Sequence, residues 1–206
     1  MWEFDKEVAA RFQQEAEKNI PDYDRVIQMC IRIADAKFKP DSIFVDVGSA
    51  LGETLYQFKA NGYRNIVGVE ASEDMRDQSM FKKDIVLSDT YPNICADMVM
   101  ANWTLHFVKE RYAYMRSIYE SLVDGGVFIL TDKTSQCDTI KELYYDFKRD
   151  NGVSESYIRE KEEKLKGYMD LYPVELYLSI LKEIGFENVQ IINAKYGFVT
   201  FYCEKV

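Results

Sequence analysis

Histidine is almost absent from this chain and cysteine is sparse, which limits the chemistry that the sequence can support. His106 is the one histidine among 206 residues, so a zinc site or a Ser-His-Asp triad would need unusual ingredients. The cysteines form no CxxC pair, a pattern typical of buried thiols in a reducing compartment. They are Cys30, Cys95, Cys137 and Cys203. We therefore expect neither a metal site nor a hydrolase.

Long apolar runs and positive charge are also lacking. No apolar stretch approaches the roughly eighteen residues of a membrane span, and the first residues do not resemble a signal peptide. Lys and Arg number 26 against 35 Asp and Glu, and the net charge of −9 disfavours tight binding of naked nucleic acid. We therefore expect a soluble cytoplasmic protein that binds neither membranes nor nucleic acid directly.

Strand-like and helix-like segments alternate through the middle of the chain, which predicts right-handed βαβ crossovers and a parallel sheet. The strand-like runs lie at 42–47, 65–70, 84–87, 97–101, 127–131, 188–193 and 198–203. Helical patterns at 53–60 and 111–122 fall between them, and another spans 173–184. No helix separates the last two runs, so they are expected to form an antiparallel pair near the end of the sheet.

Two helical segments have no place in this alternation. Residues 1–40 carry apolar positions at helical spacing, broken at Pro21, and predict a helical N-terminal extension of two helices. Residues 135–172 predict a charged helical insertion. The whole pattern predicts a single α/β domain over 1–206. Its Rossmann-like sheet has seven mostly parallel strands with a C-terminal antiparallel strand, and helices cover both faces.

The carboxyl ends of the predicted strands are the expected place for a ligand. The first strand leads into Asp46–Gly52, a DxGxAxG turn whose glycines let the backbone approach a ligand closely. Glu70 follows the second strand, where a carboxylate accepts hydrogen bonds from ribose hydroxyls. The later strand ends carry Asp89, Asn102, Asp132 and Lys133. An NAD site is less favoured because the turn lacks GxGxxG spacing, and a nucleotide-free Rossmann-like domain stays an alternative.

These residues resemble the class I S-adenosylmethionine-dependent methyltransferases and, among them, the carboxy-S-adenosylmethionine synthases. Beyond the turn and the acidic residues, the similarity covers nearly the whole chain. Its segments are Phe4–Asp5, Ile20–Tyr23, Gly48–Gly52, Asn102–Phe107, Lys133 and Asp146–Gly152. The last is the most specific, because it lies in the insertion rather than in the shared fold.

The resemblance implies a site for S-adenosylmethionine or for carboxy-S-adenosylmethionine, without a metal. It places Tyr23 over the ligand and Glu70 at the ribose. Asp89 would contact the adenine amino group, and Asn102 would lie near the sulfonium. The expected cofactor-binding residues are Tyr23, Asp46, Gly48, Ser49, Ala50, Gly52, Glu70, Ala71, Asp89, Thr90 and Asn102. The resembled family also implies a homodimer in which one subunit's insertion covers the partner's site.

One position departs from the resembled family. An ungapped count from Asp146–Arg149 brings the family's carboxylate-binding arginine onto Glu162. A glutamate repels a carboxylate, and two like charges about 4 Å apart interact by about 4 kcal/mol at an effective dielectric of about 20. Arg159 or Lys161 would take over the role if the register slips. Lys164 and Lys166 are expected on a solvated helix face.

Three functions follow, all with a small-molecule substrate. The first is an S-adenosylmethionine-dependent methyltransferase that has diverged from the synthases, which Glu162 favours. The second is a carboxy-S-adenosylmethionine synthase that uses prephenate in tRNA wobble-uridine modification, which the extent of the resemblance favours. The third is a non-catalytic cofactor-binding protein. The catalytic candidates are Asn102, Lys133 and Glu162, while a lone histidine such as His106 is more often structural.

Overall fold

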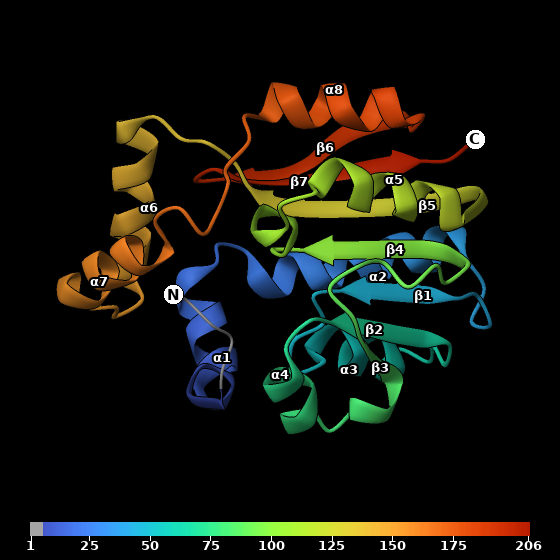
Figure 1. Ribbon diagram of the computed structural model, residues 1–206, viewed down its shortest axis with the longest axis horizontal. Helices are drawn as coiled ribbons and strands as arrows, with labels where there is room; N and C mark the ends of the chain where they lie inside the picture. The colour runs from blue at the N-terminus through green and yellow to red at the C-terminus, as the bar shows by residue number, and fades with distance from the viewer. Residues whose placement is uncertain (1–5) are drawn as a thin grey trace.

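The computed structural model describes residues 6–206, whose strands form one seven-stranded sheet (Figure 1). The strands are β1 (Phe44–Val47), β2 (Ile66–Glu70), β3 (Ile85–Leu87), β4 (Ala96–Asn102), β5 (Leu122–Lys133), β6 (Glu187–Lys195) and β7 (Phe198–Glu204). Their order across the sheet is β3-β2-β1-β4-β5-β7-β6. Strands β1 to β5 are parallel, and β7 is antiparallel to both β5 and β6. The predicted Rossmann-like fold and its antiparallel C-terminal strand are confirmed.

The strand order reverses between β1 and β4, which lie side by side although they are far apart in the sequence. At such a reversal the loops after the two strands turn to opposite faces of the sheet, and a crevice opens beyond their carboxyl ends. All four residues of β1 are buried, because helices cover both faces of this central strand. The fold therefore opens a crevice just after Val47 and Asn102.

Helices pack on both faces of the sheet and enclose two apolar cores. The helices are α1 (Lys6–Asn19), α2 (Tyr23–Lys37), α3 (Glu53–Ala60), α4 (Glu73–Gln78), α5 (Arg111–Ser121), α6 (Asp138–Asp150), α7 (Glu155–Leu165) and α8 (Val174–Ile184). Helices α2 and α3 cover Phe44, Met98 and Met100 on one face. On the other face, α5 and α8 cover Val45 and Phe128. The expectation of helices on both faces is confirmed.

Helices α1, α6 and α7 lie beyond the carboxyl ends of the strands, on the same side of the molecule (Figure 1). The hydroxyl of Tyr144 in α6 donates to the carbonyl of Asn19 at the end of α1 (2.9 Å). From α7, the Tyr157 hydroxyl donates to the Glu15 carboxylate (2.6 Å). These contacts hold α1, near the N-terminus, against α6 and α7, which follow β5. Neither segment belongs to the alternation of strands and helices in the sheet.

The structure differs from the sequence expectations in a few places. The short helix α4 has too few residues for a periodic pattern, and its N-terminus is capped by the Ser72 side chain. Cys95 and Cys137 are exposed, so only two of the four thiols are buried as expected. The segment Phe4–Asp5 of the resemblance lies outside the described residues. Among the helices of residues 6–206, none has the length and apolarity needed to cross a membrane.

Removal of the Phe44 ring tests the core under α2 and α3. Phe44 is fully buried and contacts the rings of Phe58 and Tyr63, with centroids 5.2 and 4.8 Å away. Phe44→Ala should lower the free energy of unfolding by about 3–5 kcal/mol, measured by urea denaturation. The neighbouring Ile43 is exposed, so Ile43→Ala should change it by no more than about 0.5 kcal/mol. Equal losses in both variants would contradict this core.

Candidate functional site

An open cavity of about 1530 Å³ lies at the carboxyl ends of the central strands. Its walls come from the ends of β1, β2, β4 and β5 and from α1, α2, α6 and α7. The cavity brings together all but one of the residues expected to bind the cofactor or to act in catalysis. Those that line it are Tyr23, Asp46, Gly48, Ser49, Ala50, Glu70, Ala71, Asp89, Thr90, Asn102, Lys133 and Glu162.

Gly52 is the exception. It has a φ of 88°, precedes the first residue of α3, and does not line the cavity. A Cβ at this position would lie 3.0 Å from the Phe81 ring and 3.1 Å from the Ser79 hydroxyl. In this structure the close approach of Gly52 is to other parts of the protein, and its contact with a ligand stays a prediction.

The turn after β1 lines the cavity, and its conformation depends on a glycine and on unusual backbone angles. Gly48 has a φ of 71°, and a Cβ there would lie 2.3 Å from the Thr104 hydroxyl. Ala50 also takes a positive φ of 46°, and its amide donates to the Glu70 carboxylate (2.8 Å). Only glycine fits at position 48, since any side chain would clash there and would be strained at this φ.

The carboxylate of Glu70 connects the ends of β1 and β2. It is 9% exposed and accepts hydrogen bonds from the amides of Ala50 and Ser72, both at 2.8 Å. Burial raises the pKa of Glu70, while these amides oppose the rise by stabilising the charged form. Each carboxylate oxygen has two lone pairs, so Glu70 can accept further hydrogen bonds from hydroxyl groups in the cavity.

Asp46 lies beneath the turn and differs from Glu70 in its surroundings. It is 3% exposed, and burial raises its pKa to about 8, although the Thr54 hydroxyl donates to it and lowers the pKa. The nearby Glu70 charge also contributes to the rise. In the unliganded protein, a large fraction of Asp46 is therefore protonated at neutral pH.

Four buried polar atoms in the described chain have no hydrogen-bond partner. They are Asn19 Oδ1, Ser49 Oγ, Asn102 Oδ1 and Trp103 Nε1. All four residues line the cavity. Buried polar groups without partners are costly, so their concentration at one cavity indicates a polar ligand.

Trp103 is a site residue that the sequence did not single out. It has a φ of 58°, and its amide donates to the Thr131 carbonyl (2.6 Å). Its ring stacks on Tyr23, with centroids 4.7 Å apart and 26° between the planes. Tyr23 is therefore a buried aromatic contact between α2 and the loop after β4, in addition to a wall of the cavity. The unusual φ follows from the tertiary contact, and no local signal in the sequence marks it.

A buried polar network supports the wall beside β5. The His106 Nδ1 atom pairs with the Asp132 carboxylate, which also accepts a hydrogen bond from the Tyr177 hydroxyl. Arg111 donates to the same hydroxyl (2.8 Å) and to the carbonyl of Leu105 (2.7 Å). The network holds the His106 ring at the cavity wall. Within residues 6–206, no three potential metal-ligating side chains gather as a metal site would require.

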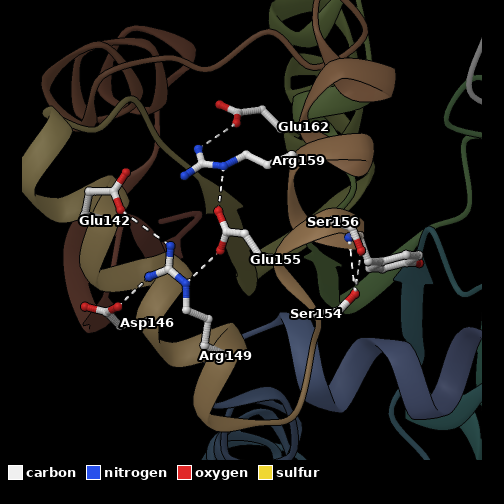
Figure 2. Close-up of polar contacts among 9 residues, drawn as sticks. Glu142, Asp146, Arg149, Ser154, Glu155, Ser156, Arg159 and Glu162 are labelled. Carbon is white, nitrogen blue, oxygen red and sulfur yellow. Dashed lines mark hydrogen bonds and ion pairs between the residues drawn. The ribbon is translucent and has the colours of Figure 1, made fainter.

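Glu162 faces the cavity but is neutralised from two sides. Its carboxylate pairs with Lys141 and lies 3.7 Å from the Arg159 guanidinium. Arg159 itself belongs to a ladder of ion pairs through Glu155 (2.7 Å) to Arg149 (Figure 2). Lys161 lines the cavity but pairs with Glu15 (3.2 Å) on α1. Both alternatives to the expected arginine are therefore already engaged by carboxylates.

Comparisons with known proteins agree with this geometry. A family model described as a methyltransferase domain matches residues 14–191. The carboxy-S-adenosyl-L-methionine synthase of Cronobacter sakazakii is 30% identical over 92% of this chain and 85% of its own length. The synthase of Helicobacter hepaticus is 26% identical over 99% of this chain and 95% of its own length.

Solved structures extend the comparison to the fold. The magnesium protoporphyrin IX methyltransferase of Synechocystis, with bound S-adenosylhomocysteine, superimposes with a TM-score of 0.72. The match covers 98% of this chain and 96% of that one at 12% sequence identity, so it demonstrates a shared fold.

Replacement of Asp46 tests its protonation. Because burial raises the pKa of Asp46 to about 8, the folded state binds one proton more than the unfolded state between about pH 4 and pH 8. This group's contribution to stability therefore falls as the pH rises through that window. Asp46→Asn should remove this pH dependence. Its free energy of unfolding relative to the wild type should therefore rise by at least about 1 kcal/mol between pH 5 and pH 8.

Urea denaturation at pH 5, 6.5 and 8 measures this difference. Asp41→Asn is the matched control, because Asp41 is exposed and this variant should follow the wild type at each pH. A difference in stability between Asp46→Asn and the wild type that stays constant from pH 5 to pH 8 would show that Asp46 is ionised throughout.

Proposed function

The chain belongs to the methyltransferase domain family, together with the carboxy-S-adenosyl-L-methionine synthases, and is an S-adenosylmethionine-dependent transferase; from this premise we propose that it transfers a methyl group to a small acceptor. The observation that carries the proposal is the turn after β1, which lines the cavity beside the Glu70 carboxylate. When bound, S-adenosylmethionine supplies an electrophilic methyl group on a sulfonium.

The residues of the cavity fit this cofactor. Gly48 lines the cavity at the end of β1, and Glu70 has lone pairs left for the hydroxyls of a ribose. Asp89 and Thr90 are exposed at the rim, after β3, where a base can be recognised. The unpartnered Oδ1 of Asn102 is available to an amino group. We assign these four groups to cofactor binding, together with Tyr23, Asp46, Ser49, Ala50 and Ala71.

The protein's contribution to methyl transfer is alignment of the reactants. Transfer from a sulfonium needs a nucleophile held in line with the methyl group, and such positioning can supply much of the rate acceleration. Asn102 and Lys133 follow adjacent strands, β4 and β5, and both line the cavity. We propose that this part of the wall holds the acceptor.

A second candidate function is synthesis of carboxy-S-adenosylmethionine, which the printed names of the relatives favour. Against it stands Glu162, whose carboxylate occupies the place that the resemblance assigns to a carboxylate-binding arginine. The pairs with Lys141 and Arg159 reduce the repulsion, but Glu162 offers no donor to a second carboxylate. Methyl transfer is therefore the preferred function.

Several finer expectations carry over as parts of this proposal. They are a cytoplasmic location and a homodimer whose partner subunit covers the cavity. A single domain over 1–206 with an extension at 1–40 and an insertion at 135–172 also belongs here. If the chain is instead a synthase, its use of prephenate and its role in tRNA wobble-uridine modification are proposals as well. A non-catalytic binding protein is the outcome if labelled cofactor binds without turnover.

Loss of the Glu70 carboxylate should weaken cofactor binding. Glu70→Ala removes charge-assisted hydrogen bonds to the cofactor, and a net loss of about 1.5–3 kcal/mol should lower the affinity for S-adenosylmethionine about 10- to 100-fold by calorimetry. Glu120→Ala, an exposed change on α5, should leave it unaltered. The melting temperature separates lost binding from lost folding, since Glu70 also accepts backbone amides. Undetectable binding of S-adenosylmethionine and S-adenosylhomocysteine by the wild type would refute the proposal.

The choice between donor molecules can be read from the ligand that accompanies the purified protein. Mass spectrometry of the small molecules released on denaturation should detect S-adenosylmethionine or S-adenosylhomocysteine. Detection of carboxy-S-adenosylmethionine would favour the synthase instead. A Glu162→Arg variant with increased affinity for the carboxylated cofactor would show that the site geometry is kept and only its charge has changed.

A further inference from the structure

The single histidine at the cavity wall pairs with a buried carboxylate, and neither residue is among those assigned to the cofactor. His106 lines the cavity with a side chain that is 5% exposed, and the side chain of its partner Asp132 is completely buried. His106 lies in the short turn Leu105–Phe107 after β4, and Asp132 is near the end of β5. This pair, the His-Asp dyad, belongs to the part of the wall proposed above to hold the acceptor, beside Asn102 and Lys133.

The carboxylate determines which nitrogen of the His106 ring carries the proton. A carboxylate only accepts hydrogen bonds, so the Nδ1 atom that pairs with Asp132 is the protonated one. The Lys133 amide lies 3.4 Å from the same atom, which is long for a hydrogen bond. In the neutral ring, Nε2 therefore holds the lone pair and can accept a proton.

The Nε2 atom of His106 is the ring nitrogen left for a molecule in the cavity. No group of residues 6–206 forms a hydrogen bond with it, since both contacts of the ring are made by Nδ1. Nε2 is also not one of the four fully buried atoms without a partner, so a molecule in the cavity can reach it. A reachable lone pair at a cavity wall is the arrangement that a general base requires.

The rest of the buried network keeps the His-Asp dyad in place. Asp132 also accepts a hydrogen bond from the Tyr177 hydroxyl, to which Arg111 donates (2.8 Å). Arg111 donates to the Asp170 carbonyl as well, and the Asp170 amide donates to the His106 carbonyl (3.0 Å). One buried guanidinium thus orients the carboxylate through Tyr177 and the main chain of His106 through Asp170. A base held in this way can take a proton at a defined point.

We infer that His106 is the general base of the transfer and that the nucleophile of the acceptor is a hydroxyl group. Nε2 takes the hydroxyl proton while the oxygen forms a bond to the methyl carbon. The bond from this carbon to the sulfur breaks, its electron pair stays on the sulfur, and S-adenosylhomocysteine leaves as a neutral thioether. The positive charge of the sulfonium therefore ends on the His106 ring, where Asp132 stabilises it. This inference rests on the proposed function and names the acceptor's chemical class.

The hydroxyl class follows from what a base adds to the reaction. A neutral amine attacks through a lone pair that it already has, whereas a hydroxyl oxygen becomes a good nucleophile only as its proton leaves. Aromatic rings beside the dyad favour a flat hydroxyl compound. The Phe107 ring lies 4.4 Å from the His106 ring and 5.5 Å from the Tyr168 ring, measured between centroids. All three side chains line the cavity, so phenol is the simplest probe of this class.

The first test reads the protonation of the ring directly by 15N NMR, because His106 is the one histidine of the chain. In the full chain saturated with S-adenosylhomocysteine, the neutral ring should carry its proton on Nδ1 and none on Nε2. Asp132→Asn should shift the ring toward the other tautomer, because an amide can donate to Nδ1. Asp124→Asn, an exposed change on the same strand, is the matched control and should leave the ring signals unaltered. A protonated Nε2 in the neutral ring of the wild type would overturn the inference.

Phenol, its methyl ether anisole and aniline test the contact with the acceptor. Added to the same complex, phenol should move the Nε2 signal because its hydroxyl donates to this atom, whereas anisole has no such proton. With S-adenosylmethionine labelled in its methyl group, the label should appear in anisole made from phenol.

Replacement of the base separates catalysis from binding. His106→Gln should lower kcat for phenol by about 100-fold or more and leave the affinity for S-adenosylmethionine unchanged, while Asp124→Asn should match the wild type in both. A melting temperature near that of the wild type shows that His106→Gln is folded, and the NMR test of the wild type does not depend on this variant. Equal effects of phenol and anisole on Nε2, or label in aniline but not in phenol, would overturn the inference.

The outcomes also separate this inference from the proposed function. If S-adenosylhomocysteine binds but phenol leaves the Nε2 signal unmoved, the inference fails while the proposed function stands. If the wild type binds neither S-adenosylmethionine nor S-adenosylhomocysteine, the proposed function fails whatever the state of the ring. If His106→Gln transfers the methyl group to phenol as fast as the wild type does, the His-Asp dyad only supports the wall and the assignment of the base is overturned.

Discussion

The hydrogen bond from the Ala50 amide to the Glu70 carboxylate is the contact on which the geometry of the cavity depends. It holds the turn after β1 against the end of β2, and a second bond from the Ser72 amide fixes the carboxylate itself. The turn can pack against Thr104 in this way only because position 48 has no side chain. Placement of a ligand by the main chain costs little reorganisation, because the strands on either side are buried and rigid.

The two ends of the cavity have opposite electrostatic character. Asp46 and Glu70 lie at the ends of β1 and β2, whereas Lys133 and Lys148 come from β5 and α6 and have no carboxylate partner among residues 6–206. In both places burial shifts the ionisation equilibria toward the neutral forms, so the unliganded protein avoids part of the cost of its own charges.

The strand ends could be predicted from the sequence because parallel strands bring their carboxyl ends to one edge, whatever the details of packing. Asp46, Glu70 and Asn102 were identified by that rule alone. Lys148 and Trp103 lie in segments of the resemblance, but their contacts could not be predicted, because they depend on how α6 and the loop after β4 pack in three dimensions. The neighbours of Gly52, Phe81 and Ser79, could not be predicted either, since glycine in a tight turn signals close approach without saying to what. The ion pairs of Glu162 likewise join α7 to α6 and have no local signature.

Strand β7 lies between β5 and β6, yet it follows both in the chain. During synthesis, the edge of β5 that pairs with β7 therefore stays unpaired until residues 198–204 have left the ribosome. Val199 is the partner of Asp132 in this ladder, so the strand that carries the buried carboxylate is completed by a segment that is made only after α6, α7, α8 and β6. A nascent chain that stops short of this strand exposes an unpaired, apolar edge, which is the kind of surface that chaperones bind and that aggregates.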